Sequence, residues 1–234
     1  MQGVLDNKNF VVSTPTASGK TLVAMLTSLN YLYNGGKVIY LSPLRALAHE
    51  KFIEFKKLET LSKSNSEKIK VLISTGDFQS NSEYLKYADL LVLTNEKFDS
   101  LLRHNVDWLN QIKLFIIDEI HLIGDPYRGA TLEMIIANIL NWDRDIQILS
   151  LSATINNIEE ISTWLNADYV DSNWRPIPLI EGIYNYGQIE FNNGDISPIK
   201  ISKSGIPVDL AIDALRPNVQ PINFTENRRR AARI

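Results

Sequence analysis

The sequence predicts an α/β fold: a parallel β-sheet with helices on both faces and a phosphate-binding loop. Short apolar runs alternate along the chain with segments of helical periodicity, and the connections between them are short. Polar motifs follow the expected strands at their carboxyl ends, the edge where open α/β sheets bind ligands. A loop of small residues ending in Gly-Lys-Thr lies between the first expected strand and the first expected helix.

The first expected strand, residues 10–12, leads directly into this loop. Backbone N–H groups in such a loop and at the start of the following helix point at phosphate oxygens. We expect Lys20 to reach the β- and γ-phosphates and the Thr21 hydroxyl to bind Mg²⁺. Thr14 occupies the first position of the pattern, where glycine is usual. The expected nucleotide-binding residues are Thr14, Pro15, Thr16, Ala17, Ser18, Gly19, Lys20 and Thr21.

The middle of the chain continues the alternation of strands and helices. Gly35-Gly36 ends the first helix, and residues 37–41 form a buried strand. Further strands are expected at residues 69–74, 89–93, 114–117 and 146–151. Further helices are expected at residues 44–58, after residue 95, at 130–140 and at 158–165.

The regular alternation of strands and helices ends after Tyr169. An extended, proline-punctuated segment precedes a hairpin around Tyr186-Gly187, and another turn follows it. A helix at residues 208–215, a strand at 220–224 and a basic helix from 227 are expected next. The predicted division is residues 1–172 as a nucleotide-binding domain, 173–207 as a linker with a hairpin, and 208–234 as the start of a truncated second domain.

The composition is that of an ordinary globular protein. Of 234 residues, 44% are hydrophobic and 22% are charged, which allows a sizeable core. The net charge of −3 gives no support for nucleic-acid binding, so any such site must be a local patch. The absence of cysteine excludes disulfides and thiolate chemistry. The sequence has no apolar run that could span a bilayer and no signal-peptide pattern.

An acidic pair, Asp118-Glu119, follows the apolar strand at 114–117. Downstream of a phosphate loop in the same sheet, the first carboxylate is expected to hold Mg²⁺. The second is expected to accept a proton from the water that attacks the γ-phosphate. Lys20, Asp118 and Glu119 are therefore the expected catalytic residues, with Thr21 and Asp118 as metal ligands. His121, two residues further, is expected to couple this site to its surroundings.

Seven motifs together resemble superfamily 2 DExH-box helicases of the Ski-type branch, and most closely the archaeal DNA-repair helicases. They are residues 14–21, 43–48, Thr75-Gly76-Asp77, Thr94-Asn95-Glu96-Lys97, Asp118-Glu119-Ile120-His121, Arg128-Gly129 and Ser152-Ala153-Thr154. The resemblance covers essentially the whole chain. It implies a RecA-like P-loop NTPase domain that uses ATP and Mg²⁺ to move along nucleic acid, in the 3′-to-5′ direction and on DNA.

The resemblance also assigns further residues by position. Those that couple the ATP state to strand movement are His121, Ser152 and Thr154. Those that follow the nucleic-acid backbone are Pro43, Arg45, Gly76, Asp77, Thr94, Asn95, Lys97 and Arg128. Relatives more often have Ser at the position of Asn95, and Asn can still donate a hydrogen bond to phosphate.

The resemblance implies partners and parts outside this chain. The expected partners are a single-stranded or tailed nucleic acid and a second RecA-like domain in cis, in a monomer located in the cytoplasm with the nucleoid. An adenine-recognition motif is expected upstream, because Gln2 lies too close to Lys20 to supply it. An arginine finger in the second domain is worth about 10³–10⁵ in rate, so the fragment alone should hydrolyse ATP slowly.

Two other functions stay open at this point. The motifs also fit an ATP-gated RNA-remodelling or scaffold protein that binds strands without unwinding. A P-loop kinase or small-molecule ATPase leaves five of the seven motifs unexplained.

The basic run Arg228-Arg229-Arg230 could bind nucleic acid or be a solvated helix face.

Overall fold

The computed structural model describes residues 7–76, 82–104, 106–142, 145–200 and 205–214. The chain divides into two compact units, Met1–Pro176 and Ile177–Ile234. Within the described residues, none of the helices combines the length and apolarity needed to cross a membrane.

The first unit is built on a seven-stranded sheet with the order β3-β4-β2-β5-β6-β1-β7. All its paired strands are parallel. The strands are β1 (Phe10–Ser13), β2 (Lys37–Ser42), β3 (Val71–Ser74), β4 (Leu90–Thr94), β5 (Ile112–Ile117), β6 (Gln147–Ser152) and β7 (Asp168–Asp171). The predicted α/β fold with a parallel sheet is confirmed.

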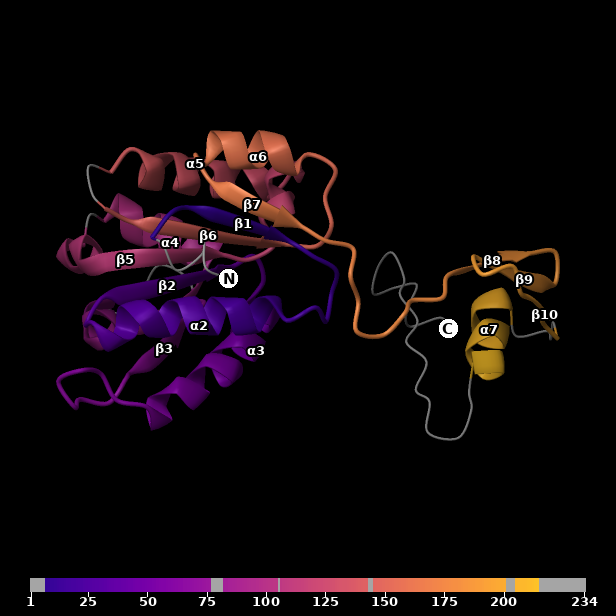
Figure 1. Ribbon diagram of the computed structural model, residues 1–234, viewed down its shortest axis with the longest axis horizontal. Helices are drawn as coiled ribbons and strands as arrows, with labels where there is room; N and C mark the ends of the chain where they lie inside the picture. The colour runs from indigo at the N-terminus through magenta and orange to yellow at the C-terminus, as the bar shows by residue number, and fades with distance from the viewer. Residues whose placement is uncertain (1–6, 77–81, 105, 143–144, 201–204, 215–234) are drawn as a thin grey trace. The chain divides into compact units, whose positions relative to one another are not determined.

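Helices cover both faces of this sheet (Figure 1). One face carries α2 (Lys20–Tyr33) and α3 (Arg45–Phe55), and the other carries α4 (Asn95–Arg103), α5 (Gly129–Leu140) and α6 (Ile158–Trp164). Short 3-10 helices connect these elements at Lys56–Thr60, Ser82–Tyr87, Asp107–Gln111 and Ile120–Gly124. This layering is what a parallel sheet needs to bury both of its faces.

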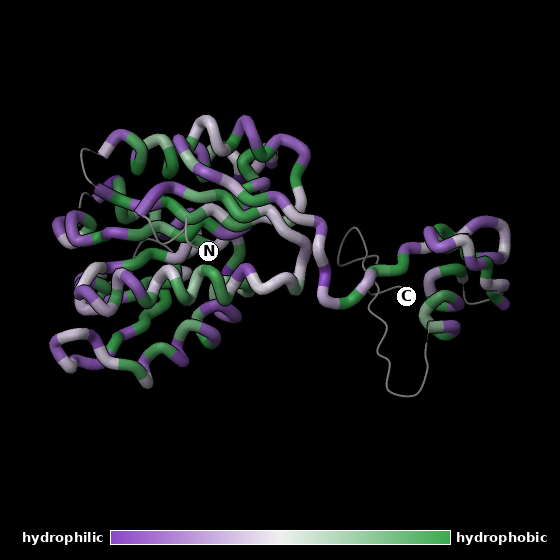
Figure 2. Tube along the Cα trace, in the orientation of Figure 1, coloured by the Kyte–Doolittle hydropathy of each residue, from purple (hydrophilic) through white to green (hydrophobic). Residues whose placement is uncertain are grey.

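Two hydrophobic cores lie on the two faces of the sheet. Side chains alternate between the faces along β2, so Ile39 and Leu41 join one core while Val38 and Tyr40 join the other. The strands accordingly appear mostly hydrophobic in Figure 2. A sheet buried on both sides positions the loops at its carboxyl edge rigidly.

The strand register brings the ends of neighbouring strands together at that edge. Ser42 pairs with Thr94 at the ends of β2 and β4, and Ser13 pairs with Ser152 at the ends of β1 and β6. Every loop that follows these strands, and hence every motif in those loops, begins at the same edge of the sheet.

The second unit contains a small antiparallel sheet and one described helix. The sheet consists of β8 (Gly182–Asn185), β9 (Gln188–Phe191) and β10 (Ile196–Pro198), in the order β10-β9-β8, and the helix is α7 (Ile206–Ala214). Tyr186 and Gly187 have φ values of 41° and 88°, which is the geometry of a tight hairpin turn. The predicted hairpin is confirmed, and β10 extends it beyond the prediction.

Most predicted elements match the structure, with two differences. The helix expected at residues 44–58 ends at Phe55 and continues as a 3-10 helix. Strand β7 was not predicted, because its four residues are all exposed and show no apolar alternation. The strand expected at 220–224 and the helix expected from 227 lie outside the described residues.

Candidate functional site

The phosphate loop runs from the end of β1 to the start of α2. Its backbone takes left-handed turns at Ala17, with φ of 62°, and at Gly19, with φ of 96°. The hydroxyl groups of Thr14 and Ser18 lie 2.6 Å apart and close the loop on itself. The Thr14 N–H donates to the carbonyl oxygen of Ser152 at 3.2 Å, which fixes the loop to the end of β6. The Thr14 hydroxyl thus closes the loop at the position where glycine is usual.

Lys20 begins α2 and folds back over the loop. Its Nζ donates to the carbonyl oxygens of Thr14 and Pro15 at 2.6 and 2.9 Å. Burial lowers the pKa of Lys20, while the negative charges of Glu119 and Asp118 oppose that shift. The ammonium group therefore lies inside the loop and close to both carboxylates, where it could meet the terminal phosphates of a nucleotide.

Asp118 follows β5 and is only 7% exposed. Its Oδ1 accepts from the N–H of Glu119 at 3.1 Å, and its Oδ2 accepts from the phenol of Tyr40 at 2.7 Å. Burial raises the pKa of Asp118, and the hydrogen bond from Tyr40 and the charge of Lys51 act in the opposite direction. The carboxylate is thus fixed by donors on two sides.

Mg²⁺ fits the groups gathered here. Lys51 Nζ donates to Thr21 Oγ1 at 3.0 Å, and the same ammonium group acts electrostatically on Asp118. The two expected metal ligands therefore both lie near Lys51. A hydroxyl and a carboxylate are the hard oxygen ligands that Mg²⁺ prefers.

Glu119, His121 and Ser152 form a short chain of polar contacts. Glu119 has a φ of 54°, a left-handed conformation that is costly for a residue with a side chain. His121 Nδ1 lies 3.2 Å from Glu119 Oε2 and 3.2 Å from Ser152 Oγ. Glu119 Oε2 is buried and has no hydrogen bond among the described residues. The structure thus brings together two of the three expected coupling residues, whereas Thr154 lies exposed beyond β6.

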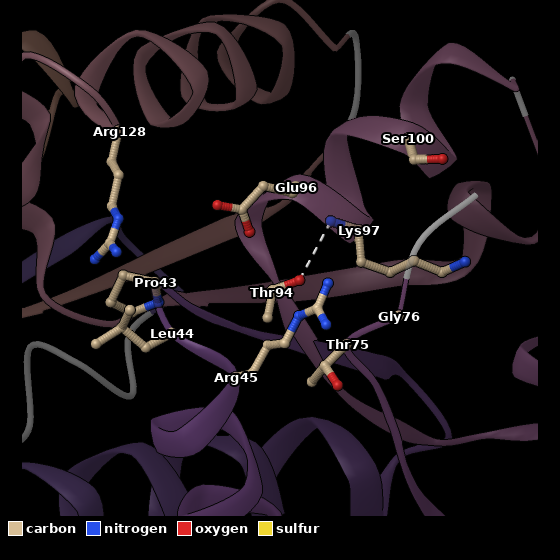
Figure 3. A pocket seen from close by; sticks show the side chains of 10 residues that line it. All are labelled: Pro43, Leu44, Arg45, Thr75, Gly76, Thr94, Glu96, Lys97, Ser100 and Arg128. Atoms are coloured by element: carbon tan, nitrogen blue, oxygen red, sulfur yellow. Dashed lines mark hydrogen bonds between the residues drawn. The ribbon is translucent and has the colours of Figure 1, made fainter. Parts of the chain in front are cut away.

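A pocket of about 360 Å³ opens at the same edge of the sheet (Figure 3). It lies where β2, β3 and β4 end and where α5 begins. Its lining residues are Pro43, Leu44, Arg45, Thr75, Gly76, Thr94, Glu96, Lys97, Ser100 and Arg128. Three of them are cations and one is an acid, so the pocket is a local basic patch on a chain with net charge −3.

Backbone and side-chain donors shape this pocket. Thr94 Oγ1 accepts from the N–H of Lys97 at 3.4 Å, a long bond that caps the start of α4. The N–H groups of Tyr127 and Arg128 donate to Asp125 Oδ1 at 2.8 and 2.9 Å. This turn directs the Arg128 side chain toward Pro43 in Figure 3.

The structure brings six of the eight expected nucleic-acid residues into this pocket: Pro43, Arg45, Gly76, Thr94, Lys97 and Arg128. Asn95 does not line it, because it is buried at the first turn of α4 and is 4% exposed. Asp77 lies outside the described residues. Ser100 was missed, although its spacing of three residues from Lys97 places both on one helix face.

Two residues of the candidate nucleotide site were also not predicted. Tyr40 looked like any buried strand residue, and Lys51 like any charged helix residue. Their roles come from contacts between elements, to Asp118 and Thr21, which no local pattern signals.

The sequence of the chain is similar to those of known helicases. Residues 1–161 match the DEAD/DEAH box helicase family. The chain is 45% identical over 230 residues to the ATP-dependent DNA helicase Hel308 of Thermococcus kodakarensis, covering 98% of this chain and 19% of that protein. It is 44% identical over 230 residues to the protein of that name from Pyrococcus horikoshii, covering 98% and 30%. It is 40% identical over 237 residues to the protein of that name from Methanocaldococcus jannaschii, covering 98% of this chain and 19% of that protein. The chain thus spans less than a third of the length of these relatives.

Proposed function

Because the chain belongs to the DEAD/DEAH box helicase family, we propose that it binds Mg·ATP and a nucleic-acid strand as the motor part of an ATP-dependent helicase. The names of its relatives, ATP-dependent DNA helicase, support DNA as the strand. The 3′-to-5′ direction belongs to the same proposal and rests on the resemblance in sequence.

One observation carries this proposal: the candidate nucleotide site and the basic pocket lie at one edge of one sheet. The phosphate loop follows β1 and the acidic pair follows β5, while the pocket lies at the ends of β2, β3 and β4. A change in the nucleotide site can therefore reach the pocket through short loops and helices such as α3. A protein that converts nucleotide binding into movement of a strand needs this arrangement.

The proposed roles in ATP hydrolysis follow from the contacts. Thr21 and Asp118 would hold Mg²⁺, which when bound offsets the negative charge of the phosphates. Lys20 contacts phosphate oxygens from inside the loop. Glu119 accepts the proton of the attacking water, and its Oε2, which accepts no hydrogen bond among the described residues, is suited to that role.

His121 is proposed to report the state of this site to the end of β6. It lies 3.2 Å from both Glu119 Oε2 and Ser152 Oγ, so a change in the hydrogen bonding of Glu119 alters the contact with Ser152. Thr14 N–H binds the same residue, which links the phosphate loop to this relay.

The division of the chain into domains is also a proposal. We propose residues 1–172 as the ATP-binding domain, 173–207 as a linker and 208–234 as the start of a second RecA-like domain. The match of residues 1–161 to the family supports the first part. The share of the relatives that the chain covers supports the proposal that the chain alone turns over ATP slowly.

Two substitutions test the proposed nucleotide site. Lys20→Ala is expected to remove binding of Mg·ATP, measured with a fluorescent nucleotide. Glu119→Gln is expected to retain nucleotide binding and to abolish hydrolysis in a single-turnover assay. Lys57→Met is the control, because Lys57 is an exposed lysine on the 3-10 helix after α3. Hydrolysis by Glu119→Gln at the wild-type rate would remove Glu119 from its proposed role.

The type of strand is tested separately. The ATPase rate of the full-length protein is measured with single-stranded DNA, with RNA of the same sequence and with no strand. Stimulation by DNA supports the proposal. Stimulation by RNA alone would favour an RNA-remodelling protein, and no stimulation by either would favour a small-molecule ATPase.

A further inference from the structure

Lys51 connects helix α3 to the candidate metal ligand Thr21. It lies in the second turn of α3, and its Nζ donates to Thr21 Oγ1 at 3.0 Å. Its side chain is 14% exposed, so the ammonium group is largely withdrawn from water. No part of the ATP mechanism described above uses this contact.

Mg²⁺ held by Thr21 would share its oxygen ligand with the ammonium group of Lys51. An Mg²⁺ ion binds its oxygen ligands at about 2.0–2.1 Å. An ammonium group that already donates to Thr21 Oγ1 uses one of the two lone pairs of that oxygen. Like charges so close repel strongly in a poorly solvated site. The ammonium of Lys51 and a metal ion on Thr21 therefore compete.

Two carboxylates on α3 also contact Lys51. Its Nζ lies 3.2 Å from Glu54 Oε2 and 3.6 Å from Glu50 Oε1, both on the same helix. Glu54 is the closer partner and lies one turn along α3. A lysine that leaves Thr21 can thus keep its charge paired without a change in the fold of the helix.

We propose that Lys51 is a positioning residue of the candidate nucleotide site, whose ammonium holds the Thr21 hydroxyl in competition with Mg²⁺ and keeps only its contacts on α3, chiefly with Glu54, when the metal binds. The inference rests on the proposed function, because it requires that the site binds a nucleotide with Mg²⁺. With no metal, the same ammonium adds positive charge close to the phosphates. Lys51 thus strengthens metal-free binding and weakens metal-dependent binding.

The test compares nucleotide affinity with and without the metal. The dissociation constant of N-methylanthraniloyl-ADP is measured on the full chain in EDTA and in excess Mg²⁺. The readout is the dissociation constant in EDTA divided by the dissociation constant in Mg²⁺. In Lys51→Met we expect this ratio to rise by about tenfold, a change equivalent to about 1.4 kcal/mol. Lys51→Arg should keep the ratio close to wild type, because the charge and the donors remain.

Controls separate this role from a structural one. Lys57→Met makes the same chemical change at an exposed site and should leave the ratio unchanged. If Lys51→Met does not fold by circular dichroism, Lys51→Gln replaces it, since it keeps a polar group of similar reach. An unchanged or smaller ratio in the folded variant would overturn the inference and leave the proposed function intact. Failure of the wild-type chain to bind the nucleotide in either buffer would overturn both.

Discussion

The phenol of Tyr40 donates a 2.7 Å hydrogen bond to Oδ2 of Asp118 from the neighbouring strand. The two residues are 0% and 7% exposed. Burial raises the pKa of Tyr40 well above its usual range, so the phenol keeps its proton and remains a donor. The carboxylate that is proposed to hold Mg²⁺ is therefore oriented by a side chain outside every motif.

Tyr40→Phe should show what this hydrogen bond contributes. The substitution leaves a buried carboxylate oxygen without its donor, which costs about 1–3 kcal/mol in the free energy of unfolding. Urea denaturation measures this loss, and weaker binding of Mg·ADP should accompany it. Tyr31→Phe is the matched control, because the Tyr31 hydroxyl donates to Asn7 at an exposed position and its loss should cost within about 0.5 kcal/mol. Equal losses in the two variants would argue against a special role for Tyr40.

Asp118→Asn should change how stability depends on pH. Burial raises the pKa of Asp118, so the folded chain binds this proton more tightly than the unfolded chain does. The stability that this group contributes is therefore present at low pH and is lost as the pH rises through the raised pKa. Asn carries no charge at any pH and lacks this dependence.

The expected outcome is a stability difference that grows with pH. The free energy of unfolding of Asp118→Asn, minus that of wild type, should increase between about pH 4 and pH 7 by about 1.4 kcal/mol for each unit by which the pKa is raised. Urea denaturation at several pH values measures the difference. A difference that is constant or shrinks over this range would contradict the expected burial of the charge.

Local patterns predicted the sheet and the phosphate loop, because their signals lie close together in the sequence. Lys20 is recognisable from its neighbours, and Asp118 from the apolar strand before it. The edge strand β7 was missed for the opposite reason: its residues, Asp168–Asp171, are exposed and carry no period.

The remaining parts of the site depend on contacts through space. Tyr40 on β2 contacts Asp118 at the end of the neighbouring strand β5, and Lys51 on α3 contacts Thr21 on α2. Within one motif, the rotation of α4 decides that Glu96 lines the pocket while Asn95 is buried. A single sequence carries no signal for the rotation of a helix. The position of the motif could therefore be predicted, but not which of its residues line the pocket.

Gly129, at the start of α5, should tolerate no side chain. A Cβ added there would lie 2.1 Å from the carbonyl oxygen and 2.8 Å from the carbonyl carbon of Ile123, which are backbone atoms that cannot rotate away. Gly129→Ala should therefore lower the free energy of unfolding by about 2 kcal/mol or more and displace the adjacent Arg128. Gly124→Ala is the control, because a Cβ there meets nothing within 4 Å. Thermal and urea denaturation of both variants compare the two costs, and similar small costs would mean that the turn before α5 can move.

Arg128 should bind a phosphate of the strand without reading its sequence. It lines the basic pocket with Arg45 and Lys97, and a hydrogen bond from its N–H to Asp125 Oδ1 fixes its backbone. A cation that neutralises one phosphate of a single strand contributes about 0.7 to the slope of log affinity against log salt concentration. Arg128→Ala should therefore weaken binding to oligo-dT and mixed-sequence DNA to a similar extent and reduce the salt slope by about 0.7.

Fluorescence anisotropy of labelled oligonucleotides between about 50 and 200 mM salt measures this slope. Arg103→Ala is the matched control, since Arg103 is 71% exposed at the far end of α4 and is paired with Asp99 at 2.8 Å. Removing Arg103 lowers the total positive charge by the same amount but should leave the slope within error. If both arginines reduce the slope equally, bulk charge and not the pocket attracts the strand, because only a residue in direct contact with a phosphate releases a counterion of its own.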